Sequence, residues 1–420
     1  MPPASSEPAP RDLLLTGARV WSAPDAPVGE PGVLLVRDGV VQQVGGDVPP
    51  DADLPHVDVG GRVVTAGFTN SHIHLSERVW ARARTAPAAA LQAEIDDMLL
   101  SRGVTTALDL GSDPRHTLPV VQRIASGELR GPEILVTGAT LMPRRGLPFY
   151  VREAMPWYAR RWIPTPASAA AARRAVAVRH RRGVVLTKLF TGSLVERDRV
   201  LAMDADVARA AVEESHRRGL LVLAHPTDRA GTAVAVRAGV DALAHVPSVA
   251  GGTADLLREA ADRGIRLIPT LHMFAAMVSP DDSFMEPVRD GLRVFLAAGG
   301  RVLFGTDVGY LTDRDLRPEL EAMAACGMTT ADVLRSLTTE PAAFLSRSDA
   351  GEVRPGARGD LTVLAHTVPD LAAGDLADVD LVVRAGRVVH RAPAFSDEPR
   401  SPDARSGDGA RVRRARDSNP

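Results

Sequence analysis

Histidine and aspartate residues that could bind a divalent metal ion end several apolar stretches of this chain. His72 and His74 lie two residues apart, so on a strand both side chains point to the same side. His225, His245 and Asp307 end three later stretches, LLVLAH, DALAH and RVLFGTD. Neutral imidazole is the commonest ligand of borderline divalent metals, and a carboxylate adds a hard oxygen donor. The set predicts a metal site, in which the later pair of histidines could hold a second ion.

Lys188, in the apolar stretch LTKLF, is the only lysine among 50 lysine and arginine residues. An ammonium group cannot bind a cation, but a neutral amine can react with CO₂ to give a carbamate, which bridges two ions as a carboxylate does. Burial and nearby metal charge both lower the pKa of a lysine, whereas arginine stays charged. We therefore interpret Lys188 as a carboxylated bridging residue, which requires CO₂ or bicarbonate.

Each of these residues has an ordinary structural explanation when it is taken alone. A histidine at a strand end is commonly a hydrogen-bonded structural residue, and Asp307 could cap a helix. The order along the chain is harder to explain in this way, because the His-x-His pair, Lys, His, His and Asp fall on the first, fourth, fifth, sixth and eighth predicted strands. The combination therefore favours a metal site.

These side chains can meet only if the strands that carry them are parallel neighbours. Eight apolar stretches alternate with helical ones, several of which end in glycine after a basic last turn. The predicted strands are residues 64–75, 105–110, 133–138, 184–190, 220–225, 241–245, 265–270 and 301–307. This alternation predicts an α/β protein with a (β/α)₈ TIM barrel over residues 63–350, whose active site lies at the carboxyl ends of the strands. An open doubly wound sheet is the alternative, but no glycine-rich phosphate loop supports it.

The two ends of the folded chain are predicted to form one small composite β-sandwich, from residues 11–62 and 351–394. Two-residue turns at Asp38-Gly39 and Ala385-Gly386 each predict a hairpin. Residues 1–10 and 395–420 are polar and are predicted to be disordered.

The amino-acid composition limits which classes of binding partner we expect for this chain. Hydrophobic residues make up 45% of the chain and charged residues 24%, as in globular proteins. The net charge of −2 gives no electrostatic reason to expect nucleic acid or an anionic membrane as a partner. The single cysteine, Cys326, excludes an internal disulfide framework and a cysteine-based zinc site. No signal-peptide pattern or membrane-spanning run is present, so we expect a cytoplasmic protein with a small-molecule substrate; assembly as a homo-oligomer stays open.

Residues 12–392 resemble the metal-dependent amidohydrolase superfamily, and within it the imidazolonepropionase-like and Xaa-Pro or Xaa-Arg dipeptidase-like branch. VVTAGFTNSHIHL is similar to the first-strand motif of that family, LTKLF to its carboxylated-lysine strand, and VLFGTDVG to its last strand. LAHPTDRAGTAVAVRAGVDALAHV is similar to the fifth and sixth strands with their helix. The resemblance implies a (β/α)₈ barrel with a β-sandwich from both termini. Asn70 departs from the motif, which most often has aspartate there, and Ala66 stands where the motif has proline.

The resemblance also implies a role for each polar residue. His72, His74 and Asp307 would bind one ion, His225 and His245 a second, and the carbamate described above would bridge them. The ions would usually be Zn²⁺, with Mn²⁺, Fe²⁺ or Co²⁺ as alternatives. A metal-bridged hydroxide would attack the substrate carbonyl, with Asp307 as general base and then general acid. The expected reaction is hydrolysis of an amide C–N bond, as in an N-acyl amino acid, a dipeptide or a lactam.

Substrate contacts are expected from the loops that follow the strands. The basic and aromatic segment after the third strand contains arginines that could bind a carboxylate bidentately, which would favour an acylated amino acid or a dipeptide. The candidate residues are Arg144, Arg145, Tyr150, Arg152, His272 and Tyr310.

Two other functions stay open at this point. A mononuclear deaminase, or a decarboxylase or isomerase of the same superfamily, would typically lack the bridging lysine. An inactive scaffold would typically have lost metal ligands, whereas all six are present here. We therefore expect a binuclear hydrolase.

Overall fold

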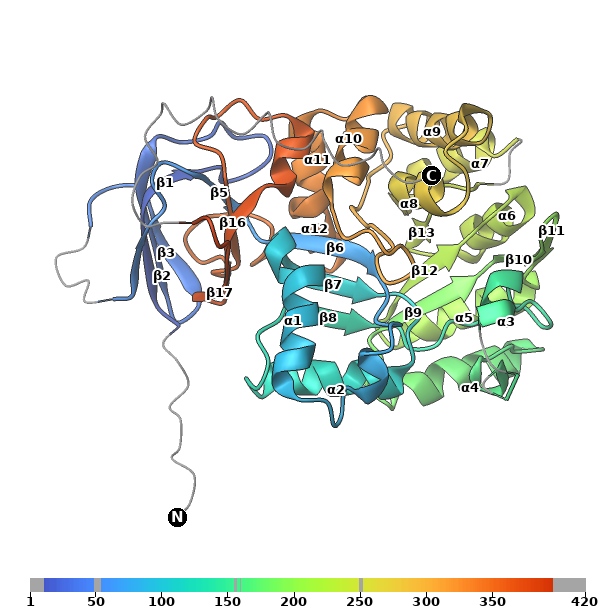
Figure 1. Ribbon diagram of the computed structural model, residues 1–420. Helices are drawn as coiled ribbons and strands as arrows, with labels where there is room; N and C mark the ends of the chain where they lie inside the picture. Colours follow the sequence, from blue (N-terminus) through green and yellow to red (C-terminus); the bar gives the residue numbers. More distant parts are fainter. Residues whose placement is uncertain (1–10, 49–53, 155–156, 159, 249–251, 396–420) are drawn as a thin grey trace, which may run out of the picture.

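The computed structural model describes residues 11–48, 54–154, 157–158, 160–248 and 252–395. Strands from both ends of the chain form a sheet at one side of the molecule, and alternating strands and helices form the rest (Figure 1). The predictions of disorder for residues 1–10 and 396–420 lie outside the described residues. Phe395, the first residue of the predicted tail, is buried in the core of the terminal sheet.

The terminal sheet has eight strands and combines both ends of the chain. Its order is β17-β16-β15-β5-β1-β2-β3, and β4 also pairs with β1. The N- and C-terminal parts join where β5 runs antiparallel to β15. The strands are β1 (Leu13–Val20), β2 (Pro31–Arg37), β3 (Val40–Val44), β4 (His56–Asp58), β5 (Val63–Ala66), β15 (Leu361–Leu364), β16 (Val379–Arg384) and β17 (Arg387–Arg391).

Two tight turns close the hairpins of this sheet, and both were predicted. Asp38 and Gly39 have φ values of 52° and 76° between β2 and β3, and Ala385 and Gly386 have 48° and 78° between β16 and β17. Positive φ at both central residues is the conformation whose twist matches that of the flanking strands.

The remaining strands form two parallel sheets, β6-β7-β8 and β9-β12-β13-β14. Isolated parallel bridges connect their edges, at Leu141–Leu189 on one side and at Leu267–Val302 and Ile73–Val308 on the other. The strands are β6 (Phe68–Ile73), β7 (Val104–Asp109), β8 (Glu133–Val136), β9 (Leu186–Phe190), β12 (Leu221–His225), β13 (Ala242–Ala244) and β14 (Arg266–Ile268). A short hairpin follows β9, formed by β10 (Gly192–Glu196) and β11 (Arg199–Ala202).

Two of the predicted strands differ from the structure. Residues 64–75 were predicted as one strand, but the chain leaves the terminal sheet after β5 and enters the parallel sheet at β6. Residues 301–307 form one isolated bridge, at Val302, rather than a continuous strand, and Asp307, with a φ of 62°, leaves the extended conformation at the end of this segment. Gly305 lets this segment approach β6 closely, since a Cβ there would lie 3.0 Å from the backbone nitrogen of His72.

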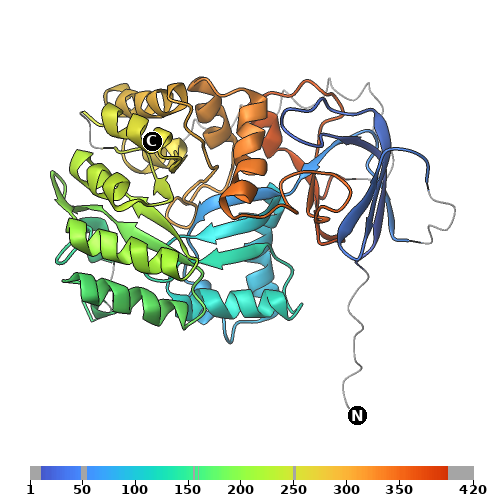
Figure 2. The same ribbon diagram turned by 180° about the vertical axis from the view of Figure 1, so that it is seen from behind.

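Helices connect and cover the parallel strands, and α4, α5 and α6 pack side by side (Figure 2). Local signals explain their ends: Asp204 caps α5, Asp228 caps α6, and Gly239 ends α6 with a φ of 77°. Among the described residues, no helix is long and apolar enough to cross a membrane. The helices are α1 (Ala88–Met98), α2 (Pro114–Ala125), α3 (Phe149–Ala154), α4 (Ala169–His180), α5 (Ala205–Arg217), α6 (Arg229–Ala238), α7 (Ala254–Asp262), α8 (Leu271–Met277), α9 (Asp282–Ala297), α10 (Arg317–Ala325), α11 (Thr330–Leu337) and α12 (Thr339–Phe344).

Candidate metal centre

Polar side chains meet at the carboxyl ends of the parallel strands. His72 lies near the end of β6, Lys188 lies on β9, and His225 is the last residue of β12. His245 directly follows β13, and Asp307 lies in the segment that bridges to β6. Neighbouring parallel strands point the same way, so their carboxyl ends share one edge of a sheet, where ligands of α/β proteins bind.

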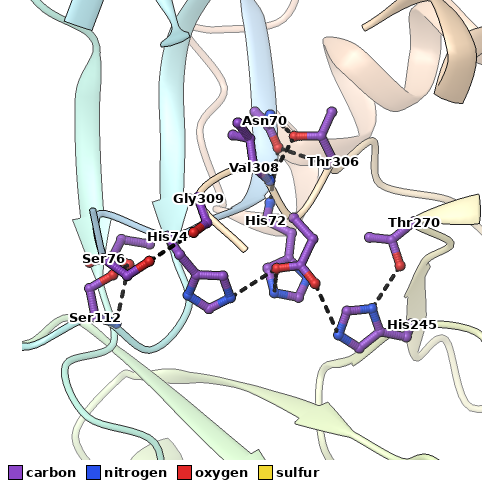
Figure 3. A network of polar contacts seen from close by, with 12 residues as sticks. Asn70, His72, His74, Ser76, Ser112, His245, Thr270, Thr306, Val308 and Gly309 are labelled. Carbon is purple, nitrogen blue, oxygen red and sulfur yellow. Dashed lines mark hydrogen bonds and ion pairs between the residues drawn. The ribbon is translucent and has the colours of Figure 1, made fainter. Parts of the chain in front are cut away.

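The carboxylate of Asp307 lies among three imidazole rings. Its Oδ1 is 2.9 Å from His74 Nε2 and 3.4 Å from His72 Nε2, and its Oδ2 is 3.9 Å from His245 Nε2. Figure 3 shows these three rings side by side, with dashed lines to one carboxylate. Ligand atoms from His72, His245 and Asp307 all lie within 4.8 Å of one another. That spacing suits a divalent ion, because zinc lies about 2.0–2.2 Å from each nitrogen or oxygen ligand.

The other two predicted ligands lie against this group. The ring of His225 is 4.6 Å from that of His245 between centroids, and it stacks on Phe190 at 4.2 Å. Lys188 is 2% exposed, and its Nζ has no hydrogen-bond partner among the described residues. The structure thus brings all six predicted metal ligands into one cluster.

Burial controls the charge of this cluster. It lowers the pKa of His72, His225 and His245 well below the usual value, and the charge of Lys188 acts in the same direction. Burial also lowers the pKa of Lys188 to about 7, while the charge of Asp307 opposes that change. The three histidines are therefore neutral near pH 7, which is the form that binds metals.

Backbone strain is concentrated here. His245, Thr270 and Asp307 have φ values of 95°, 51° and 62°, in the left-handed region that non-glycine residues rarely adopt. Such conformations persist only where the surrounding structure enforces them, and they cluster at functional sites.

A hydrogen bond to the Thr270 hydroxyl orients the ring of His245. The Thr270 hydroxyl donates to the carbonyl of Pro269 at 2.8 Å and lies 2.7 Å from His245 Nδ1. Because that hydroxyl hydrogen is already used, Nδ1–H of His245 is the donor. The lone pair of Nε2 then faces Asp307, as a metal ligand requires.

Asn70 links β6 by hydrogen bonds to the segment that carries Asp307 (Figure 3). Its Oδ1 accepts from the backbone N–H groups of His72 and Thr306, at 3.2 and 3.3 Å. Its Nδ2 donates to the Thr306 hydroxyl at 2.9 Å. An aspartate, which the family motif more often has here, could not donate, so the threonine hydroxyl would have to donate instead. Asparagine thus fits the hydrogen-bond pattern of this chain.

We expect Asn70→Ala to lower the free energy of unfolding by about 2–4 kcal/mol. The substitution removes the acceptor of two buried N–H groups, and each unsatisfied group costs about 1–3 kcal/mol. Urea unfolding measures the change. The matched control is Gln92→Ala, which removes a partly buried amide on α1 far from the cluster. Equal, small losses of unfolding free energy in both variants would contradict the role of Asn70 in linking β6 to the Asp307 segment.

The predicted substrate-binding arginines are exposed, unlike the buried residues of the cluster. Arg144 and Arg145 are exposed, and Arg152 is exposed with its guanidinium donating to the carbonyl of Val195 at 3.3 Å. His272 lies at the start of α8, and its Nε2 pairs with Asp313 Oδ2 at 3.0 Å.

The two predicted tyrosines lie near the cluster. The rings of Tyr150 and Tyr310 are 5.7 Å apart between centroids. Burial raises the pKa of both, and in both the charge of Asp307 adds to the effect. These two phenols are therefore the candidate residues best placed to contact a substrate at Asp307.

Three buried residues near the cluster were not predicted from the sequence. Asp109 ends β7 and accepts from the hydroxyls of Ser112 and Thr117, and burial raises its pKa. The strand-end pattern that singled out the histidines applies equally to Asp109, in TTALDL. It applies to Thr270 as well, which ends the predicted strand 265–270, whereas no sequence signal indicates Glu319, because its contacts are with a different element.

Residues 63–389 match the sequence profile of the Amidohydrolase family. The chain belongs to the amidohydrolase family. The matched region contains all six clustered residues, and the match confirms the resemblance that the motifs indicate.

Several named proteins are similar to this chain in sequence or in structure. Imidazolonepropionase from Salinispora arenicola (strain CNS-205) is 27% identical over 381 residues, which cover 81% of this chain and 88% of the relative. The structure of a putative prolidase from Bifidobacterium longum is 25% identical, with a TM-score of 0.73 over 90% of this chain and 95% of that one. A Xaa-Pro dipeptidase with bound methionine in the active site is 19% identical, with a TM-score of 0.75 over 91% of this chain and 100% of that one, and shares the fold.

Proposed function

We propose that this amidohydrolase is a binuclear metal-dependent hydrolase that cleaves an amide or related carbon–nitrogen bond, with carboxylated Lys188 as the bridging ligand. The observation that carries the proposal is the buried amine of Lys188, which lies beside the histidines and Asp307 without a hydrogen-bond partner among the described residues. An unpaired buried ammonium is costly, whereas a carbamate converts the same side chain into an anionic ligand.

The donor set fits divalent ions. His72, His74 and Asp307 would hold one ion and His225 and His245 the other, with Zn²⁺ as the first choice and Mn²⁺, Fe²⁺ or Co²⁺ as alternatives. Bound ions would supply Lewis acidity and lower the pKa of water toward neutrality. Asp307 would accept the proton of the attacking water and return it to the leaving amine.

The arrangement of strands agrees with the (β/α)₈ barrel that the family implies. The bridges at Leu141–Leu189, Leu267–Val302 and Ile73–Val308 lie where neighbouring strands of a closed barrel would pair. A barrel would direct the side chains of five different strands to one opening, as a binuclear site needs.

The substrate class that we infer is N-acyl amino acids, dipeptides and lactams. The similarity to proteins named imidazolonepropionase and prolidase supports carbon–nitrogen bond hydrolysis. Tyr150 and Tyr310 are the proposed contacts near Asp307. An arginine clamp from Arg144 or Arg145 would require these exposed side chains to turn toward the site.

Metal content per chain tests the proposal first. We expect about two divalent ions per chain, by elemental analysis of protein purified without chelator or metal-affinity resin and supplied with bicarbonate. About one ion would favour a mononuclear enzyme, such as a deaminase. No bound ion after metal and bicarbonate are supplied would contradict the proposal.

A matched pair of histidine variants makes the result specific to the site. His245→Ala removes a buried ring of the cluster, whereas His216→Ala removes a ring that pairs with Asp241 outside it. We expect the first variant to lose bound metal and the second to keep the wild-type content. Substrates are then screened among N-acyl amino acids, dipeptides and lactams.

A further inference from the structure

Glu319, on α10, is a buried carboxylate whose position calls for an explanation. It is 1% exposed, and it forms no ion pair among the described residues. Its Oε1 accepts from the backbone N–H of Leu271 at 3.0 Å, and its Oε2 accepts from that of His272 at 2.7 Å. Burial raises its pKa to about 7, and hydrogen bonds from the backbone of residues 270–272 oppose that change. A buried carboxylate without an ion pair is costly, so its two backbone hydrogen bonds must offset that cost.

The N–H groups that Glu319 accepts from belong to the first residues of α8, directly after Thr270. Thr270 has φ and ψ of 51° and 45°, a left-handed conformation that is strained for a β-branched residue. The two oxygens of Glu319 hold the peptide groups that follow this strained residue. They therefore fix the direction in which the Thr270 side chain points.

Thr270 in turn orients His245 through the 2.7 Å hydrogen bond to Nδ1. This bond leaves Nε2 of His245 facing Asp307 at 3.9 Å. Glu319, the start of α8, Thr270 and His245 thus form a continuous series of contacts that ends at the proposed metal centre.

We propose that Glu319 is a positioning residue for the metal centre, which acts by holding Thr270 in its left-handed conformation so that His245 presents Nε2 to the ion. The inference rests on the proposed metal-dependent function. Glutamine is a poor replacement, because its amide nitrogen would face a backbone N–H, so one donor would lose its acceptor. The outer partners of metal-binding histidines typically change metal affinity by about 10–100-fold when they are removed.

The test compares Glu319→Gln with Glu214→Gln, a substitution of another buried glutamate, on α5, which pairs with Arg217 and Arg218 instead. Dissociation constants for Zn²⁺ and Co²⁺ are measured by competition with a chromophoric chelator at pH 8, where Glu319 is ionised. The visible absorption of the Co²⁺ protein reports the geometry of the ligands. We expect Glu319→Gln to weaken metal binding by about 10-fold or more and to shift the Co²⁺ spectrum, whereas Glu214→Gln changes neither.

Variants of Thr270 show whether the effect passes through its hydroxyl. Thr270→Val should weaken metal binding as Glu319→Gln does. Thr270→Ser keeps the hydroxyl and should retain most of the wild-type metal affinity. The double variant Glu319→Gln with Thr270→Val should bind metal no more weakly than Thr270→Val alone, because the two residues act on the same ring.

The outcomes separate this inference from the proposed function. If wild-type protein binds metal and Glu319→Gln binds it equally tightly with the same Co²⁺ spectrum, the positioning role is overturned and the proposed function stands. If Glu319→Gln does not fold, the same metal affinities and Co²⁺ spectrum are measured for Glu319→Asp. That side chain keeps the negative charge but is shorter by one methylene, so its carboxylate no longer reaches the N–H groups of α8 in the same way. Wild-type protein that binds no metal overturns both.

Discussion

We expect replacement of Lys188 by arginine to abolish hydrolysis and to leave the secondary structure intact. Lys188 is 2% exposed on β9, and burial lowers its pKa to about 7, so a neutral amine is available to react with CO₂. A guanidinium stays charged and cannot form a carbamate. If Lys188 is the bridging ligand that we propose, its loss should lower kcat/KM by about 10³-fold or more, equivalent to about 4 kcal/mol of transition-state stabilisation. Steady-state kinetics measures the loss, and circular dichroism checks the fold.

A second substitution at this position separates loss of the ligand from the cost of a larger buried cation. Lys188→Ala creates space beside His225 and His245, into which a short carboxylate can diffuse. We expect partial recovery of activity and of metal content when acetate or propionate is added. Full activity in Lys188→Arg would contradict the carbamate, because that variant cannot form one.

Asp307→Asn has the second-largest expected effect. The carboxylate lies 2.9 Å from His74 Nε2 and 3.4 Å from His72 Nε2, so in the proposed mechanism it would act both as a metal ligand and as the proton acceptor. Asparagine keeps the size but cannot accept and return a proton, and general acid–base catalysis contributes about 10²–10⁴-fold. We expect kcat to fall by about 10³-fold or more, because the anionic ligand is lost as well.

The control for that substitution is Asp282→Asn, which removes an exposed carboxylate at the start of α9. It should keep the wild-type kcat and metal content. A wild-type kcat in Asp307→Asn would exclude Asp307 as the proton acceptor, and retained kcat with reduced metal content would leave it only a binding role.

The positions of the clustered residues followed from local patterns in the sequence. Apolar stretches that end in a polar residue predicted strands with His72, His225 and His245 at their carboxyl ends, and Lys188 was conspicuous as a charged residue within such a stretch. This worked because burial on both faces makes parallel strands continuously apolar, so a polar residue there is conspicuous. The two hairpin turns were predictable for a similar local reason, since both central residues must tolerate positive φ.

Residues that act through contacts between distant elements were not predictable in this way. Glu319 lies 48 residues from Leu271, and Thr270 lies 25 residues from His245, so no sequence period relates them. The arginines expected to bind substrate were chosen for their charge alone, and the structure leaves Arg144 and Arg145 exposed. The left-handed backbone at Asp307, which replaces the end of a predicted strand, also has no local signal.

The sequence by itself determined the family, the parallel strand–helix alternation and the six residues that gather at the strand ends. These depend on residue type, spacing and burial along single elements, which local hydrophobic patterns encode. Only the tertiary structure decided how the six side chains face one another, which hydrogen bonds orient them, and which loop residues lie beside Asp307. Those relations arise from packing between elements far apart in the chain, where the position of a side chain depends on every element that surrounds it.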